Sequence, residues 1–172
     1  MGTTSDEALH DYVAARYRDL RRSAFLMCGD WALADELTRT SLARLVADAH
    51  RDGVHDPDAY VYSDLMAAFQ HRPARREHVF LAGPDPTSGT ARGAATARDA
   101  GAADRQMRTV LVLDALHHLA PRCRAVLVLR HGTGFTVDET ADVLGLADER
   151  VEAYEAAGLA ALGQLLPKVA AR

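Results

Sequence analysis

The sequence predicts an all-α protein made of two small helical domains joined by a flexible linker, the second of which contains a helix-turn-helix. Apolar side chains recur every three or four residues in several segments, and strand-like alternation is absent from the 172 residues. A stretch without large apolar side chains, residues 82–106, separates two such regions. Beyond it, VDETADVLGLADERVEAYEA has the spacing of two short helices around a tight turn.

The front domain, residues 5–81, is expected to be a small helical bundle. Three segments each show one apolar stripe, which is typical of helices that bury one face. Asp30 and Asp56 are N-capping residue types and stand where the second and third helices should begin. Three amphipathic helices are therefore predicted, over residues 8–28, over residues 31–49, and from Pro57 until Pro73 ends the third.

Residues 82–106 read as a flexible linker because they contain mainly Ala, Gly, Pro, Ser, Thr and charged side chains. Such a composition buries too little apolar surface to offset the entropy of ordering the chain. Helical spacing resumes over residues 107–118, and Pro121 can open another helix that Gly132 and Gly134 end. The rear domain is expected to span residues 107–167.

The helix-turn-helix has a recognisable skeleton. Thr136 and Glu139 form a T-x-x-E capping box that starts its first helix. Ala141 is small enough for two helices to press together, and Gly145 stands in the turn, where a left-handed backbone favours glycine. Val151 is then expected to pack the second helix against the first.

The second helix of this motif carries the wrong charge for DNA. A recognition helix in a major groove normally presents Arg, Lys or polar side chains. Here Arg150 is the one base among four acids, which are Asp148, Glu149, Glu152 and Glu155.

Composition excludes several classes of protein. A net charge of −4 does not suggest a protein that coats nucleic acid. No segment has transmembrane length and no signal peptide is evident, so a soluble cytoplasmic protein without membrane contact is expected. Cys28 and Cys123 should be free thiols, and no histidine pair has zinc-type spacing. Enzyme motifs are absent, so we predict no catalysis, no cofactor and no metal site.

Over nearly its whole length the chain resembles the extracytoplasmic-function (ECF) sigma factors of actinobacterial RNA polymerase. YRDLRRSAFLMCGDWALADELTRTSLARL looks like the helices that meet the polymerase clamp, and HDPDAYVYSDLMAAF looks like the helix that opens promoter DNA. ALHHLAPRCRAVLVLR followed by the helix-turn-helix looks like the promoter-binding domain. The family pattern A-L-x-x-L-P-x-R-x-R-A-V-L-V-L-R is matched densely between Leu116 and Arg130.

The resemblance implies two sets of site residues. The clamp-binding residues would be Asp35, Glu36, Leu37 and Arg39. The DNA-binding residues would be Tyr60, Tyr62, Arg72, Arg75, Arg76, Arg122, Arg124, Arg150 and Tyr154. On the residues alone, the arginines at 122 and 124 fit a solvated helix face equally well, and those at 72, 75 and 76 fit a charged helix end.

The departures from the family pattern replace basic or polar side chains with acidic or neutral ones. The promoter-opening helix has Asp64 and Ala67 where the family has basic residues and Asn. The recognition helix has Glu152 and Ala153 where the family has Lys and Ser. We therefore predict an ECF-sigma-like transcription regulator that binds core RNA polymerase, with autonomous promoter recognition weakened. The alternative is a sigma-derived interaction module that binds an anti-sigma factor or another regulator without reading DNA. Replacing Glu152 with Lys and Glu155 with Arg should create DNA affinity if charge is the only defect.

Overall fold

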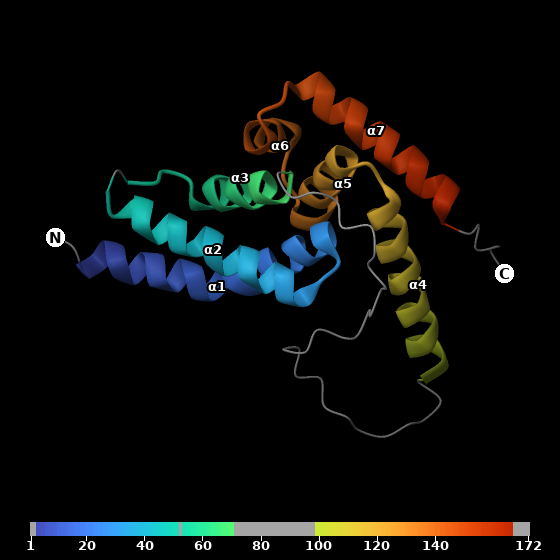
Figure 1. Cartoon of the computed structure of the whole chain (residues 1–172), viewed down its shortest axis with the longest axis horizontal. Helices are drawn as coiled ribbons and strands as arrows, with labels where there is room; N and C mark the ends of the chain where they lie inside the picture. The colour runs from blue at the N-terminus through green and yellow to red at the C-terminus, as the bar shows by residue number, and fades with distance from the viewer. Residues whose placement is uncertain (1–2, 52, 71–98, 167–172) are drawn as a thin grey trace.

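Residues 3–51, 53–70 and 99–166 are described by the computed structural model, and every regular element within these ranges is helical (Figure 1). The all-α prediction is therefore confirmed. None of these helices is both long and apolar enough to cross a membrane. The elements are α1 (Thr3–Cys28), α2 (Trp31–Ala49), α3 (Pro57–Gln70), α4 (Asp99–His118), α5 (Pro121–Leu127), the π-helical turn η1 (Val128–Thr133), α6 (Val137–Leu144) and α7 (Asp148–Leu165).

The front half consists of α1, α2 and α3, and both predicted helix caps are present. α1 and α2 lie side by side in opposite directions, and α3 packs beside α2 (Figure 1). The Asp30 carboxylate accepts from the backbone N–H groups of Ala32 and Leu33 at 2.8 and 3.1 Å. Asp56 accepts in the same way from Ala59 at 3.0 Å. These caps satisfy N–H groups that have no partner inside the helix.

Two carboxylates of α3 fasten that helix to its neighbours. Asp58 accepts from the Tyr12 hydroxyl at 2.7 Å and forms an ion pair with Arg16, both on α1. Asp64 accepts from the Ser41 hydroxyl and pairs with Arg44, both on α2, at 2.6 Å each. The acid at position 64 therefore has a structural role inside the front half.

The rear half consists of α4 to α7, and α4 is longer than predicted. It begins at Asp99 rather than at Met107, so the last part of the expected linker, residues 99–106, is helical. Alanine has the highest intrinsic helix propensity, and the Ala-rich sequence here allows the helix to extend beyond the apolar stripe that marked its start. Residues 71–98, which hold the rest of the expected linker and the end of the predicted front domain, lie outside the described residues.

The helix-turn-helix prediction is confirmed in detail. The Glu139 carboxylate accepts from the backbone N–H of Thr136 at 2.7 Å, and the Thr136 hydroxyl accepts from the N–H of Glu139 at 3.2 Å. Gly145 ends α6 in the left-handed region with φ 61°. Ala141 and Val151 are buried and share a small core with Val126 of α5. Each position does what the sequence pattern required of it.

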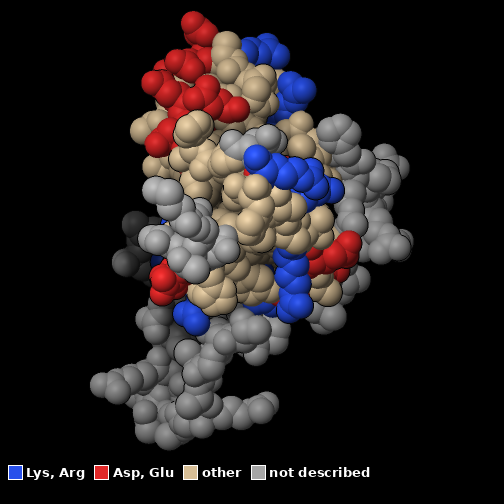
Figure 2. All heavy atoms as spheres, turned by 90° about the vertical axis from the view of Figure 1, so that its left-hand side faces the viewer, with Lys and Arg blue, Asp and Glu red and all other residues tan. Residues whose placement is uncertain are grey.

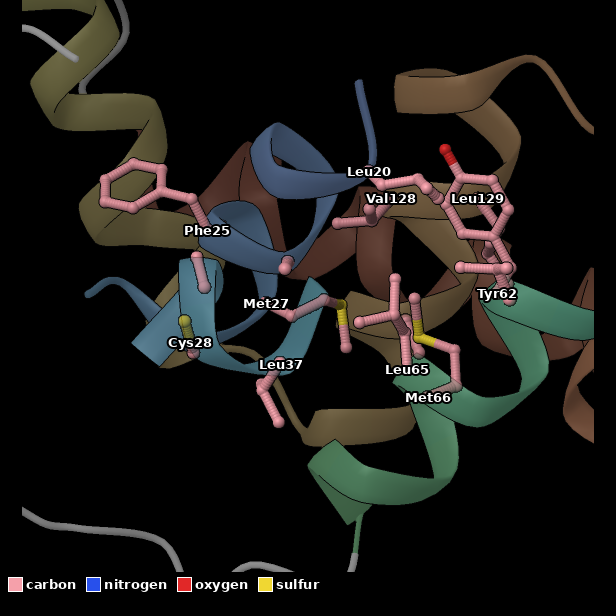
Figure 3. Close-up of a cluster of buried hydrophobic side chains, with 14 of the residues drawn as sticks. Leu20, Phe25, Met27, Cys28, Leu37, Tyr62, Leu65, Met66, Val128 and Leu129 are labelled. Atoms are coloured by element: carbon pink, nitrogen blue, oxygen red, sulfur yellow. The ribbon is translucent and has the colours of Figure 1, made fainter. Parts of the chain in front are cut away.

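The two halves are packed against each other on one shared core. Leu113, Val128, Leu129 and Val143 of the rear half belong to the same buried cluster as the core residues of α1, α2 and α3. Figure 3 shows Val128 and Leu129 beside Leu20 and Tyr62. We call this contact of α1 and α3 with α5, η1 and α6 the seam. Across it the Tyr62 and Phe135 rings meet edge to face, with centroids 5.0 Å apart and planes at 74°.

Gly158 marks the closest approach of α7 to α5 and gives a stability prediction. A Cβ at this position would lie 2.9 Å from Leu127 Cδ1 and 3.4 Å from the Cβ of Cys123. We expect Gly158→Val to lower the free energy of unfolding by about 2–3 kcal/mol through overpacking. Gly163→Val in the same helix is the matched control because that position is open, and it should change stability by less than about 0.5 kcal/mol. Urea denaturation of both variants measures the difference, and equal midpoints would contradict this account of the α5–α7 contact.

Candidate nucleic-acid and polymerase interface

The face of the helix-turn-helix that would meet a DNA groove is acidic. Figure 2 shows acidic side chains gathered at the top of the molecule, where α6 and the start of α7 lie in Figure 1. Partial desolvation, with the neighbouring carboxylates of Asp138, Glu149 and Asp142, raises the pKa of Asp148 above its usual value. We define the acidic face by its five exposed members, Asp138, Asp142, Asp148, Glu149 and Glu152.

Glu155 does not belong to this exposed surface. Its carboxylate accepts from Arg130 Nε at 3.2 Å and lies 2.8 Å from His131 Nε2, so it ties the middle of α7 to η1. The side chain is only 16% exposed. The double change of Glu152 to Lys and Glu155 to Arg is therefore a poor test of DNA affinity, because Arg at 155 would face Arg130 and loosen α7.

This ion pair gives a second stability prediction. Glu155→Gln keeps the side-chain shape but removes the charge, and we expect it to lower the free energy of unfolding by about 1–2 kcal/mol, since a charge-assisted bond is stronger than a neutral one. Glu152→Gln, on the exposed side of the same helix, should cost less than about 0.5 kcal/mol. Thermal denaturation at neutral pH and moderate salt provides the comparison, and two equal costs would refute the structural role of Glu155.

Three of the expected DNA-binding residues come together on the surface of α5 and α7. Arg150 donates to the Tyr154 hydroxyl at 3.3 Å and also lies over the Tyr154 ring, 5.4 Å from its centroid. Arg122 donates to the same hydroxyl at 3.4 Å. The hydrogen bond from Arg122 and the charge of Arg150 lower the pKa of Tyr154. This exposed cluster is the basic group that adjoins the acidic face.

Two other expected DNA-binding residues are buried, contrary to the prediction. Tyr62 is 2% exposed and Arg124 is 9% exposed. The Tyr62 ring packs against Phe135, which lies between η1 and α6, and its hydroxyl lies 3.4 Å from that of Ser23 on α1. Arg124 turns inward, where its guanidinium donates to backbone carbonyls instead of phosphates. Neither side chain can touch DNA in this arrangement.

Tyr60 is half-buried, and its hydroxyl donates to the Asp48 carboxylate, which raises the pKa of Tyr60. A phenol held by a neighbouring carboxylate is a poor contact for phosphate, since the same carboxylate repels the phosphate charge. The predicted contacts at Arg72, Arg75 and Arg76 lie outside the described residues.

The expected polymerase-binding residues also include both exposed and buried side chains. Glu36 and Arg39 are exposed on α2, whereas Leu37 is buried at 7% exposure and is a core residue, not a contact residue. Asp35 accepts from the Tyr17 hydroxyl and pairs with Arg39 at 2.8 Å, and these contacts lower the pKa of the Asp35 carboxyl. The side chains at 36 and 39 therefore form the accessible part of this surface.

Sequence reasoning missed the inward role of Arg124 and the pairing of Glu155 with η1. Arg130 and Glu155 are 25 positions apart, and no local spacing pattern connects residues at that separation. Helical periodicity could not have found it, because Glu155 comes seven residues after Asp148 and so projects from nearly the same side of α7. Among the described residues, no group of three or more His, Cys, Asp or Glu side chains is arranged to hold a metal ion.

Comparison with known proteins agrees with the helix-turn-helix in the rear half. Residues 115–163, from the end of α4 through most of α7, match the family model described as Sigma-70, region 4. The rear half therefore carries a domain of the sigma-70 region 4 type, and the matched segment contains the whole helix-turn-helix. No curated protein sequence matches the chain significantly.

Three solved structures share the fold of nearly the whole chain. One is the sigma factor RpoE with the anti-sigma factor NepR from Bartonella quintana (TM-score 0.68, 18% identity, 96% of this chain and 99% of that chain). Another is CnrH with the cytosolic domain of CnrY (TM-score 0.62, 20% identity, 94% and 88%). The third is the anti-anti-sigma factor PhyR with NepR from Bartonella quintana (TM-score 0.57, 18% identity). That match covers 91% of this chain, which spans only 49% of the PhyR chain.

Proposed function

We propose that this chain is a sigma-factor-like transcription regulator of the ECF type that works in the cytoplasm, binds core RNA polymerase and does not recognise promoter DNA by itself through α7. The acidic face of the helix-turn-helix carries the second part of this proposal. Five exposed carboxylates occupy the side of α6 and α7 that would approach phosphates, and Arg150 is the one base among them. Repulsion at that distance opposes binding, and each phosphate contact that is missing lowers affinity further.

Polymerase binding is supported by the resemblance of the α2 sequence to the clamp-binding helix and by the exposure of Glu36 and Arg39. These two side chains lie one turn apart on the outer side of α2. A helix surface with a carboxylate and a guanidinium one turn apart suits a polar, charge-complementary protein contact. The core beneath it, with Leu37 and Leu42 buried, holds the surface rigid.

An alternative function is a regulatory interaction module that binds an anti-sigma factor or another regulator in place of polymerase. One observation favours it. PhyR, whose structure is similar, is an anti-anti-sigma factor, and its partner in that crystal is an anti-sigma factor. The same fold therefore occurs in a regulatory protein, and an acidic helix-turn-helix face fits a protein that binds other proteins.

The experiment that separates the two functions is co-elution with purified core RNA polymerase on a sizing column at moderate salt. We expect wild type to co-elute, Glu36→Lys to weaken the complex about tenfold or more, and Glu7→Lys to leave it unchanged. Glu7 is an exposed acid near the start of α1 and matches the charge change of the first variant. Absence of co-elution for every form would refute polymerase binding and favour the regulatory module.

A second measurement addresses promoter recognition. The polymerase complex, if formed, and the free chain should be titrated against duplex DNA at about 50 mM salt, where electrostatic binding is strongest. We expect no specific binding by the free chain. Tight, sequence-dependent binding by the free chain would overturn the proposed role of the acidic face.

A further inference from the structure

We propose that the cavity where α1, α3 and η1 meet is a binding site for a small phosphate monoester, a sugar phosphate or a nucleoside monophosphate. This inference goes beyond the proposed function, and its test does not depend on polymerase binding. The cavity measures about 320 Å³, and none of the residues that line it belongs to the acidic face or to α2. Small-molecule sites in proteins measure about 300–1,000 Å³, so this cavity has room for a metabolite of modest size.

The inner wall of the cavity holds two buried hydroxyl groups that have one hydrogen to spare. Ser23 is 4% exposed and Tyr62 is 2% exposed, and both line the cavity. Their oxygens lie 3.4 Å apart, and only one of the two can donate in that contact. Neither hydroxyl makes another hydrogen bond within the described part of the chain, so the second O–H group has no acceptor there. A buried donor without an acceptor costs free energy, and a ligand oxygen that accepts from it would remove that cost.

Two guanidinium groups of α1 line the same cavity. Arg22 is exposed and forms no ion pair or hydrogen bond within the described ranges, so its N–H groups are free to bind a ligand. Arg16 is held by Asp58 through Nε and Nη2, and its Nη1 makes no hydrogen bond to a described residue. The cavity therefore offers cationic donors from two side chains beside the unused O–H group.

A phosphate monoester matches these donors better than a carboxylate does. It carries about 1.5 to 2 negative charges at neutral pH and three terminal oxygens, whereas a carboxylate carries one charge and two oxygens. A guanidinium group binds phosphate oxygens in pairs, and a further oxygen remains for the hydroxyl group. One phosphate group can therefore accept from Arg16, from Arg22 and from the inner wall of the cavity.

Asp19 indicates the organic part of the ligand. Its carboxylate lines the cavity and forms no ion pair with another described residue. A carboxylate accepts from hydroxyl groups and repels a second phosphate. These properties favour a monophosphate that bears hydroxyl groups over a diphosphate or a nucleic-acid strand.

Gly132 of η1 leaves one side of the cavity open. Short π-helical turns such as η1 are frequent at functional sites. A Cβ at position 132 would lie 3.6 Å from Leu26 Cδ1 and 3.7 Å from Val128 Cγ1, which are ordinary contact distances. Packing therefore does not require glycine here, and a longer side chain would extend into the cavity that Gly132 lines. A substitution at this position can fill the cavity without changing its charge.

The test titrates the full chain with inorganic phosphate, ribose 5-phosphate and adenosine monophosphate by isothermal titration calorimetry. We expect ribose 5-phosphate to bind with a dissociation constant of about 100 μM, and inorganic phosphate about tenfold more weakly because it lacks the contacts of the sugar. Arg22→Gln and Gly132→Leu should each weaken binding about tenfold or more, the first by removing a cationic donor and the second by filling the cavity. Arg18→Gln is the matched control, because Arg18 is exposed one turn away on α1 and does not line the cavity. Circular dichroism checks that each variant keeps its helices.

Nuclear magnetic resonance locates the bound phosphate. The backbone amide signals of Ser23, Gly132 and Thr133 should shift during the titration with ribose 5-phosphate, since these residues line the cavity. The signals of Arg150 and Tyr154 should not shift. Those two residues belong to the other exposed basic cluster, so they report binding by surface charge away from the cavity.

Binding that Arg22→Gln and Gly132→Leu weaken, and that Arg18→Gln leaves within about twofold of wild type, supports the site. Tighter binding of adenosine monophosphate than of ribose 5-phosphate then identifies a nucleotide as the ligand, and the reverse order identifies a sugar phosphate.

Three other results overturn the proposal. One is the absence of binding by wild type to every probe up to about 10 mM. Another is an equal loss in Arg18→Gln and Arg22→Gln, which would mean that net charge alone attracts the phosphate. The third is a loss confined to Arg22→Gln, or signal shifts confined to Arg150 and Tyr154, either of which places the phosphate outside the cavity. None of these results bears on polymerase binding, so the proposed function is decided separately.

Discussion

Replacing Arg124 with alanine is expected to lower the free energy of unfolding by about 4 kcal/mol, the largest effect of any single charged residue described above. The guanidinium is 9% exposed, and each of its nitrogens donates to a carbonyl, at Leu116, His117, Leu119 and Met27. Removing the donor takes this partner from the carbonyls of Met27, His117 and Leu119, whereas Leu116 keeps the N–H of Leu119 at 3.2 Å. Each buried carbonyl left without a partner costs about 1–3 kcal/mol.

Desolvation of the charge offsets part of this effect, so the bonds to the carbonyls have to outweigh it. Burial lowers the pKa of Arg124, because desolvation disfavours the charged form. Four carbonyl oxygens from two helix ends replace the water that the charge lost, so the charge is stabilised by dipoles and not by a carboxylate. Arg124→Lys retains a charge but lacks the planar set of donors that reaches both helix ends.

The measurement is urea denaturation followed by circular dichroism, with Arg122→Ala as the control. Arg122 is exposed and makes one long contact to Tyr154, so its loss should change stability by less than about 0.5 kcal/mol. Arg124→Lys should lie between wild type and Arg124→Ala. Equal stability of the two alanine variants would mean that Arg124 is not the residue that joins the ends of α1 and α4.

Reversing charge on the acidic face is expected to create DNA binding in a protein that we propose does not read DNA through α7. The variant combines Asp142→Lys, Glu149→Lys and Glu152→Lys, three exposed positions that carry no ion pair in the described structure. It leaves Glu155 in its pair with Arg130, and it leaves the Thr136–Glu139 capping box intact. The scaffold that holds α7 is therefore unchanged while the charge on its outer face is inverted.

The expected dissociation constant for duplex DNA is about 10 μM at low salt, in the range of non-specific binding. Its logarithm should depend on the logarithm of salt concentration with a slope of about 0.9 per phosphate contacted. The control triple variant, Glu7→Lys, Asp11→Lys and Asp114→Lys, has the same net charge but carries it on α1 and α4. Fluorescence anisotropy with labelled duplex DNA compares the two.

Binding by the face variant but not by the control would show that the helix-turn-helix retains a shape able to meet DNA. Equal binding by both would mean that net charge alone explains it. No binding by either would mean that the seam or another feature, and not charge, prevents α7 from reaching DNA.

Local patterns predicted the fold well because the physics behind them is local. The caps at Asp30 and Asp56, the capping box at Thr136 and the left-handed turn at Gly145 involve atoms only two to four residues apart. The start of α4 at Asp99 was missed because an apolar stripe marks where a helix packs and not where it begins.

The candidate site was predicted less well, because exposure depends on distant residues. Glu36, Arg39, Arg122, Arg150 and Tyr154 lie where a contact surface requires them, partly or fully exposed. Tyr62 and Arg124 do not. A tyrosine or arginine on a helix can face water or the interior. Tyr62 is buried because the rear half packs against α3, and Arg124 is buried because the carbonyls of two helix ends surround it.

The sequence by itself determined the helical content, the helix-turn-helix and the acidic charge of its outer face, since periodicity, capping and charge are properties of short segments. Only the tertiary structure decided which acids are free and which are structural, as Glu152 and Glu155 show three residues apart on one helix. It also decided that the two halves share one core. That choice depends on many weak apolar contacts between segments far apart in the chain, and their sum is not visible in any one segment.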